Sequence, residues 1–494
     1  MFVPLTALYV APIWLFKYFP SQDGPSHLYN AFILAHYHDP QYVFSRIFDI
    51  KTEVFPNWTS HLVLMALMRL VSPLAAEKIL LSAYVVLMAS SLVYIANAAG
   101  LDRTPLAFLV FPFIYSYPLL MGFYNFSIAV ALSLVAVGYW WRHRPASGAR
   151  HVLVMTVLLV AIYFCNPVPL VVAILSIFVM AGVDWLEQRR LARSLVGVLC
   201  VMPSIALLVY FAGHWGVATR EGGWTPDRLW PYFIHGGPLI FHGRGQIVSA
   251  GIVTAMLGLL LASTLGRRIA IGVREHRFKA EPADVFLVLS LMCLILYFVS
   301  PQGLSDGAFL KPRLALFPFL LIVPWLRVDF PQTASRYFGG CCLALAAACA
   351  VQVAFYHRTI NREISVYTSG LDVVDRNSVV LPLSFDSSGG SWLIGTLANA
   401  SGHYGYERGV LSLLNYEADS NHFPTTFKAG LSRPSAVDIF VHGESLTIAD
   451  YKDTVDYVIT WSMPPRSAIE GQIERYYRQV WTNGKLKIFK RTVS

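Results

Sequence analysis

Charged residues are scarce in this chain of 494 residues: only 14% are Asp, Glu, Lys or Arg, whereas 55% are hydrophobic. Acidic side chains are almost absent from the interiors of the long apolar runs, and the mean hydropathy is +0.53. Ordinary soluble domains do not have this composition. Apolar runs recur as far as about residue 356, which predicts a polytopic α-helical membrane protein.

Cysteine is also rare, and its six positions form neither a disulfide framework nor a metal-binding motif. All six lie inside apolar runs: Cys165, Cys200, Cys293, Cys341, Cys342 and Cys349. We expect them to be small packing residues. The first apolar segment, residues 2–19, lacks a basic start and a small-residue cleavage site, so we interpret it as a retained anchor.

The basic residues set the expected topology. The net charge of +9 comes mostly from Lys and Arg in short loops between apolar runs, which indicates membrane orientation and no nucleic-acid partner. Residues 57–71 are short for a span, which needs about 20 residues, so we expect them to lie along the outer membrane surface. This choice keeps the basic loops in the cytoplasm and places residues 20–76 in a large first outer loop.

The resulting prediction is a membrane domain over residues 1–356. It has about eleven spans, at residues 2–19, 77–98, 104–121, 126–141, 151–166, 168–184, 195–213, 247–266, 284–301, 312–327 and 337–356.

Residues 357–494 are expected to form an extracytoplasmic α/β domain. Residues 378–383 and 456–461 have the β-branched and aromatic content of strands, and residues 479–489 contain two short apolar runs around an Asn-Gly turn, which predicts a hairpin. Residues 386–435 are rich in Ser, Gly, Asn and His, which indicates loops with short helices. They contain no nucleophile motif, phosphate loop or metal-spaced cluster.

The stretch from Pro20 to His27 follows directly on the first expected span and brings Asp23 and His27 to the membrane surface. Its two Pro and one Gly favour a turn, and a surface helix is expected from about Ser26. A carboxylate held in this way is partly desolvated, which suits a general base. We predict Asp23 and His27 as catalytic residues; the alternative role of Asp23 is to cap the surface helix.

Other polar residues gather at the same outer face. Three histidines share the first outer loop: His36, His38 and His61. Their spacing is not a specific metal signal, so interfacial packing is favoured and no metal ligand is assigned. Asn125 lies in a short outer turn, either as a turn residue or as part of a cavity. Lys78, beside Glu77, is either an interfacial anchor or part of a polar cavity rim.

The loop at residues 300–313 is the second polar site. Lys311 and Arg313 flank a proline at the outer end of an expected span, and Asp306 lies in the same loop. Positive charge on the outer side runs against the topology bias, and a lipid phosphate explains it because Arg binds phosphate through two parallel hydrogen bonds. We predict Lys311 and Arg313 as phosphate-binding residues and Asp306 as a cavity residue. The alternative is snorkelling to outer headgroups.

With these residues placed, the chain resembles the C superfamily of integral-membrane glycosyltransferases (GT-C). Its layout is similar to that of the protein O-mannosyltransferases and the bacterial aminoarabinose transferases. Asp23 with His27 resembles the acidic motif after the first span of those families, and residues 57–71 resemble a surface helix. The run from Arg313 to Pro318 resembles the Arg-Tyr-Leu-Leu-Pro type of start of a late span. Two departures are a single acid in the first motif and Asn125 where many members have Asp.

The resemblance implies a polyprenyl-phosphate monosaccharide as donor, presented from the outer leaflet of the bacterial inner membrane. Asp23 would deprotonate or orient the acceptor hydroxyl, and Lys311 with Arg313 would stabilise the leaving phosphate. The other partners would be the lipid bilayer and an acceptor glycan, lipid or protein. No nucleotide site is implied. No cofactor is assigned, and a divalent metal stays open because of the two departures.

Two other classes of function remain. A transporter or flippase of lipid-linked glycans would need polar groups and broken helices in the middle of its spans, whereas the polar residues here gather at one face. A non-catalytic membrane scaffold would use the C-terminal domain to bind a partner.

Overall fold

A computed structural model of the chain describes residues 1–98, 104–143, 148–188, 191–215, 219–220, 225–276, 280–304, 307–327 and 331–492. Asp306 lies outside the described residues. The chain divides into two compact units. The first unit comprises Met1–Pro12, Ser82–Leu119 and Asn125–Val353, and the second comprises Ile13–Leu81, Leu120–Tyr124 and Ala354–Ser494. The second unit therefore groups the expected first outer loop with the C-terminal segment.

Five of the described helices contain boundaries between the units: α1 (Phe2–Leu15), α4 (Pro73–Ala96), α6 (Tyr117–Leu120), α7 (Tyr124–Arg142) and α16 (Gln332–Tyr367). The division expected between residues 356 and 357 thus falls inside the continuous helix α16.

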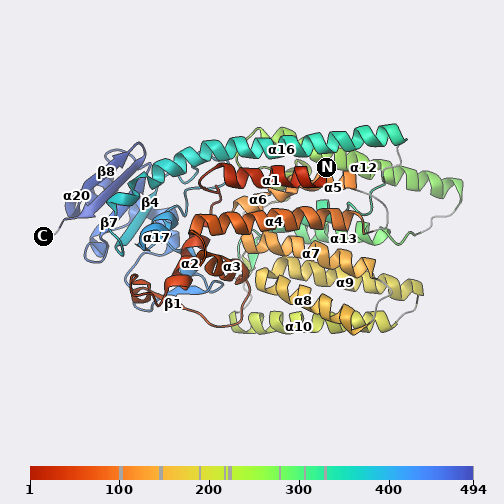
Figure 1. The fold of residues 1–494 in the computed structure, drawn as a ribbon, viewed down its shortest axis with the longest axis horizontal. Coiled ribbons are helices and arrows are strands. Elements are labelled where there is room, and N and C mark those ends of the chain that lie inside the picture. The colour runs from red at the N-terminus through yellow and green to blue at the C-terminus, as the bar shows by residue number, and fades with distance from the viewer. Residues whose placement is uncertain are drawn as a thin grey trace. The chain divides into compact units, whose positions relative to one another are not determined.

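The first unit is otherwise almost entirely helical. Its elements are α5 (Thr104–Val110), η2 (Phe111–Ile114), α6 (Tyr117–Leu120), α7 (Tyr124–Arg142), α8 (Ala149–Cys165), α9 (Pro167–Gln188), α10 (Leu191–Trp215), β2 (Thr219–Arg220), α11 (Pro226–Ile234), η3 (Gly237–Leu239), α12 (Gln246–Arg274), α13 (Asp284–Val299), β3 (Gly303–Leu304), α14 (Leu310–Leu314) and α15 (Leu316–Leu321). The helices α8, α9 and α10 pack against one another, and Figure 1 shows them side by side.

Six helices among the described residues are long and apolar enough to cross a membrane: α4, α7, α9 (with Pro167–Leu186 as the apolar part), α10 (Leu195–His214), α12 and the helix that begins at Gln332. The expected count of about eleven spans is therefore not established. Two of the expected spans are interrupted: residues 104–121 form α5, η2 and α6, and residues 312–327 contain the short helices α14 and α15. Prolines such as Pro112 and Pro318 lie in these segments, and a proline removes a helical hydrogen bond.

The second unit contains a five-stranded sheet with the order β5-β4-β7-β9-β8. Its strands are β4 (Val379–Ser384), β5 (Leu411–Ser412), β7 (Tyr457–Trp461), β8 (Tyr477–Asn483) and β9 (Leu486–Arg491). The strand β4 is parallel to β5 and β7, and β9 is antiparallel to both β7 and β8. Both predicted strands and the predicted hairpin are confirmed, and Gly484 in the hairpin turn has a φ of 55°.

Successive residues of a strand point to opposite faces of the sheet. Here they pack in two different apolar clusters, so both faces of the sheet are covered. Val380 packs in one cluster with Ile364 of α16, whereas Leu381 packs in the other with Ile473 of α20 (Ala468–Tyr476). Figure 1 shows α20 beside the sheet. The remaining elements of this segment are η4 (Thr368–Val373), α17 (Gly402–Arg408), α18 (Tyr416–Asp419), β6 (Thr425–Phe427), α19 (Ala436–His442), η5 (Gly443–Ser445) and η6 (Ile448–Tyr451).

The N-terminal part of the second unit packs against the C-terminal part and pairs a strand with it. Its elements are α2 (Gly24–His36), η1 (Phe44–Arg46), β1 (Phe48–Ile50) and α3 (Thr59–Met68). The strand β1 pairs antiparallel with β6, with Asp49 opposite Thr426. The helix α3 has only ten residues, about 15 Å at 1.5 Å per residue, so it is too short to cross a bilayer.

Glycine allows α17 to approach α2 closely. A Cβ atom on Gly402 would lie 2.3 Å from the carbonyl oxygen of Pro25 in α2, and one on Gly405 would lie 2.2 Å from the ring of Tyr29. The first of these contacts is with backbone, which cannot rotate away. The two glycines therefore set how closely α17 packs on α2.

We predict that Gly402→Ala destabilises the protein by about 1–3 kcal/mol, because α17 must shift away from α2. The matched control is Gly471→Ala in α20, where a Cβ atom meets nothing within 4 Å. That change should be neutral or stabilising by about 0.5–1 kcal/mol, since Ala is the better helix former. Unfolding of the purified protein in detergent measures both, and equal effects would contradict the close packing of α2 and α17.

Candidate active site

The predicted motif is held by backbone bonds to a glycine turn. The amide of Gln22 donates to the carbonyl of Leu120 at 3.0 Å, and the amide of Asp23 donates to that of Met121 at 3.2 Å. Gly122 has a φ of 92°, and a Cβ atom there would lie 2.7 Å from the Asp23 Cβ. Only glycine fits this contact, so the turn at residues 120–122 fixes the position of Asp23.

Asp23 precedes the first residue of α2, but its side chain makes no capping hydrogen bond. Its Oδ1 atom instead accepts from Asn399 Nδ2 at 2.9 Å and from Gln22 Nε2 at 3.4 Å. Asp23 is only 7% exposed. Burial raises the pKa of Asp23 to about 6, although the positive charge on His27 and the hydrogen bond from Gln22 oppose the shift. A held carboxylate of this kind can accept a proton near neutral pH.

One helical turn further along α2, His27 lies between two acceptors. Its Nε2 is 2.9 Å from the carbonyl oxygen of Gly122, and its Nδ1 is 2.9 Å from Glu417 Oε1. Burial lowers the pKa of His27, but the carboxylates of Glu417 and Asp23 raise it by more, so the net shift is upward.

The histidine His61 of α3 reaches the same carboxylate. Its Nε2 lies 2.7 Å from Glu417 Oε2, and its ring centroid is 5.2 Å from that of His27. His61 and Glu417 are fully buried. Burial raises the pKa of Glu417, but the two imidazoles lower it by more, so the net shift is downward. His27, His61 and Glu417 are hereafter called the His–Glu–His cluster.

A pair of asparagines fixes the orientation of Glu417. Asn30 of α2 and Asn415, the residue before α18, exchange amide hydrogen bonds of 3.0 and 2.9 Å. Asn415 Oδ1 also accepts from the amide of Ala418, 3.4 Å away, so it caps α18. Asn30 and Asn415 are buried. The start of the short helix α18 is thereby bonded to α2 two residues before Glu417.

A further buried carboxylate lies beside the motif. Glu77 at the start of α4 accepts a hydrogen bond from the Tyr124 hydroxyl at 2.7 Å, and that hydroxyl is 2.7 Å from Ser21 Oγ. A Cβ atom on Gly24 would lie within 2.8 Å of all three groups. Gly24 therefore leaves room for this chain of hydrogen bonds behind Asp23.

The structure brings together Asp23 and His27 of the predicted residues. Lys78 belongs to the same unit, where its Nζ donates to the carbonyl of Phe16 at 2.7 Å and lies 5.6 Å from the ring centroid of Trp14.

The predicted residues Asn125, Lys311 and Arg313 belong to the first unit, and Asp306 lies outside the described residues. Asn125 is buried near the start of α7. Lys311 Nζ donates to the carbonyls of Phe298 at 2.9 Å and Tyr297 at 3.4 Å, so it caps the C-terminal end of α13. The guanidinium of Arg313 lies 5.5 Å from the ring centroid of Phe126.

Sequence reasoning missed Asn399 and Glu417 and interpreted His61 as a packing residue. Asn399 and Glu417 lie in the polar segment 386–435, where single Asn and Glu residues form no recognisable spacing. Glu77 was noticed only as a partner of Lys78.

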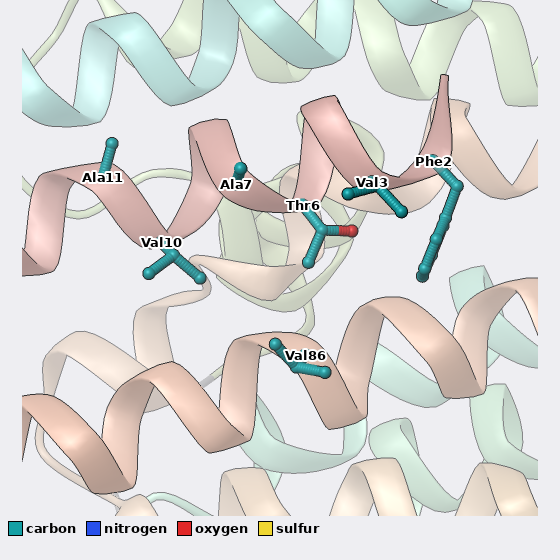
Figure 2. A pocket seen from close by; sticks show the side chains of 7 residues that line it. All are labelled: Phe2, Val3, Thr6, Ala7, Val10, Ala11 and Val86. Carbon is teal, nitrogen blue, oxygen red and sulfur yellow. The ribbon is translucent and has the colours of Figure 1, made fainter.

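A separate groove of about 450 Å³ lies in the first unit, along α1 and α4. It is lined by Phe2, Val3, Thr6, Ala7, Val10 and Ala11 of α1 and by Val86 of α4, as Figure 2 shows. The Thr6 hydroxyl is the one polar side-chain group among these lining residues. The groove has the chemistry of a site for an apolar chain and offers no group for acid–base catalysis.

No protein-family model matches the chain, and no curated protein matches it. Solved structures do. An arabinofuranosyltransferase from Mycobacteria matches 100% of this chain with a TM-score of 0.50 at 13% identity, and this chain covers 40% of it. This likeness shows a shared fold, and the matched enzyme is a GT-C glycosyltransferase. The resemblance drawn from the sequence is thereby confirmed at the level of the fold.

Two structures of an oligosaccharyltransferase from Archaeoglobus fulgidus also match. The complex with Zn and sulfate aligns with 99% of this chain and 73% of its own, with a TM-score of 0.46 at 11% identity. The apo form aligns with 99% and 74%, with a TM-score of 0.41 at 10% identity.

We predict that Asp23 and Asn399 are energetically coupled. In a double-mutant cycle of Asp23→Ala and Asn399→Ala, the coupling in the free energy of unfolding should be about 1.5–3 kcal/mol, the range for a hydrogen bond to a charged group. The control cycle pairs Asp23→Ala with Asn377→Ala, whose side chain bonds instead to the carbonyl of Gln41. Denaturant titration in detergent measures the four free energies, and additive effects in the first cycle would show that the two side chains do not bond.

Proposed function

We propose that the chain is a membrane glycosyltransferase that moves a sugar from a polyprenyl-phosphate donor to an extracytoplasmic acceptor. The observation that carries the proposal is the Asp23 carboxylate, buried and held by Asn399 and Gln22 without capping α2. The GT-C fold supports it, because the solved structures with this fold are named as enzymes that transfer sugars.

The proposed reaction uses Asp23 as general base. The acceptor hydroxyl oxygen forms a bond to the anomeric carbon of the donor sugar while the bond from that carbon to the phosphate oxygen breaks. The hydroxyl proton passes to the Asp23 carboxylate, and the polyprenyl phosphate leaves with the bonding electron pair and one more negative charge. A carboxylate with one oxygen fixed by Asn399 is oriented before the substrate arrives, which lowers the entropic cost of the step.

We assign the donor phosphate mainly to Arg313. Its planar guanidinium matches two phosphate oxygens. Lys311 contributes positive charge at the same short helix α14, while its ammonium also caps α13. The acceptor is a glycan, a lipid or a protein. The apolar groove along α1 has the right chemistry for a lipid chain.

The proposal places the chain in a bacterial inner membrane, with residues 357–494 and the first outer loop on the extracytoplasmic side. The support for this orientation is the distribution of Lys and Arg among the loops. It agrees with the requirement that a polyprenyl-linked sugar and its acceptor meet on the same side of the membrane.

Asp23→Asn should reduce turnover by about 10²–10⁴-fold, because an amide cannot accept the proton. Donor affinity should change little, since the amide keeps the shape and a hydrogen-bonding oxygen. The assay is sugar transfer from radiolabelled polyprenyl-phosphate donors in proteoliposomes, with donor binding measured separately.

The matched control is Asp39→Asn, an acid in the same loop whose side chain accepts from the amide of Gln41 near the end of α2. It should keep wild-type turnover. Wild-type turnover of Asp23→Asn with a verified substrate would reject the general-base role and move the transporter or scaffold function ahead.

Arg313→Ala should weaken donor binding as well as turnover, because the phosphate is charged in the ground state and gains charge as it leaves. Arg313→Lys should restore only part of both, since an ammonium lacks the planar fork. Lys311→Ala should mainly lower stability, because two carbonyls of α13 lose their donor. Donor binding by equilibrium dialysis and thermal unfolding distinguish these effects; unchanged donor affinity in Arg313→Ala would remove Arg313 from the phosphate site.

A further inference from the structure

The His–Glu–His cluster places both imidazoles between two acceptors. The outer nitrogen of His27, Nε2, faces the carbonyl of Gly122 at 2.9 Å, and the outer nitrogen of His61, Nδ1, faces that of Asn57 at 3.3 Å. A carbonyl oxygen can only accept, so each outer nitrogen carries a proton. In a neutral imidazole the other ring nitrogen is then a lone-pair donor.

The two inner nitrogens converge on one carboxylate. His27 Nδ1, His61 Nε2 and the Glu417 oxygens all lie within 4.8 Å of one another, and the three residues are buried. His27 Nδ1 and Glu417 Oε1 approach to 2.9 Å as an ion pair, yet neither atom has a hydrogen-bond partner among the described residues. Two atoms that bind the same ion lie close together without a hydrogen bond between them. For two ligands bound tetrahedrally to Zn²⁺ at 2.0–2.1 Å, the separation is roughly 3.3 Å.

We propose that His27, His61 and Glu417 bind a divalent cation of the Zn²⁺ class. Two imidazole nitrogens and one carboxylate oxygen form a ligand set that suits Zn²⁺ better than Mg²⁺ or Ca²⁺, which prefer all-oxygen sites. The carbonyls of Gly122 and Asn57 fix the tautomer and ring orientation of the two histidines, as outer hydrogen bonds do around zinc ligands. A cation at this place also neutralises the buried carboxylate of Glu417.

The metal joins three separate elements. His27 belongs to α2, His61 to α3 and Glu417 to α18, so one ion cross-links the first outer loop with the C-terminal segment. The Asn30–Asn415 pair holds the start of α18 against α2. Because Asp23 directly precedes α2 and lies four residues before His27, the site acts on Asp23 by positioning this helix. The proposal does not depend on the identity of the transferred group.

The test is the metal content of the full-length protein, purified in detergent with a tag that contains no histidine. Elemental analysis should find about one Zn²⁺ per chain, and X-ray absorption should show nitrogen and oxygen neighbours at about 2.0–2.1 Å without sulfur. Chelation should lower the unfolding temperature, because a ligand that binds only the folded state stabilises it.

Two variants remove single ligands. Glu417→Gln keeps the size of the side chain, and His61→Asn keeps a polar group near the carbonyl of Asn57; both should lose most of the metal. The matched control is His36→Asn on the same helix as His27, where the imidazole bonds to Asp39 instead, and it should keep the metal. If Glu417→Gln does not fold, the metal content of His61→Asn and the X-ray absorption spectrum of the wild-type protein still test the site.

Two results would overturn the proposal. One is a wild-type protein that contains no Zn²⁺ and takes up none in competition with a chromogenic chelator, which would identify the cluster as two histidines that contact Glu417 directly, without a metal ion. The other is an unchanged metal content in both ligand variants, which would place the ion elsewhere. A protein that binds Zn²⁺ as described but transfers no sugar would reject only the proposed function.

Discussion

A carboxylate removed from water has to be paired, and the second unit pairs its buried carboxylates with side chains from the other end of the sequence. Asp23 bonds to Asn399, and Glu417 bonds to His61, across separations of 376 and 356 residues. The Asn30–Asn415 pair spans 385 residues. These bonds make residues 13–81 and 354–494 one folded body, in which neither part satisfies its polar groups alone.

Structural features that depend on residues close together in the sequence were predicted correctly from local patterns. The strands β4 and β7 and the hairpin of β8 and β9 follow from runs of β-branched and aromatic residues and from one Asn-Gly turn. The motif around Asp23 was found because Pro and Gly directly after an apolar run mark a turn. Its surroundings were only partly foreseen: the helix α2 begins at Gly24, two residues earlier than expected, with proline in its first turn.

Features that depend on distant residues were not predicted. Glu417 gains its role from His27 and His61, and nothing in its own neighbourhood distinguishes it from a surface acid. The number of spans could not be predicted from the sequence either, because a proline can kink an apolar helix or divide it into two. Residues 104–121 read as one continuous apolar run but form three short elements.

The long-range bonds of Asp23 also constrain the order of assembly. A ribosome releases α2 early, when Asn399 and Glu417 have not yet been made, and the intervening membrane helices must be inserted in the meantime. During that interval the polar groups of the first outer loop can be satisfied only by water or by temporary partners. The hydrogen bonds around Asp23 are therefore completed late, only after the C-terminal segment has been synthesised, and until then the carboxylate has no fixed orientation.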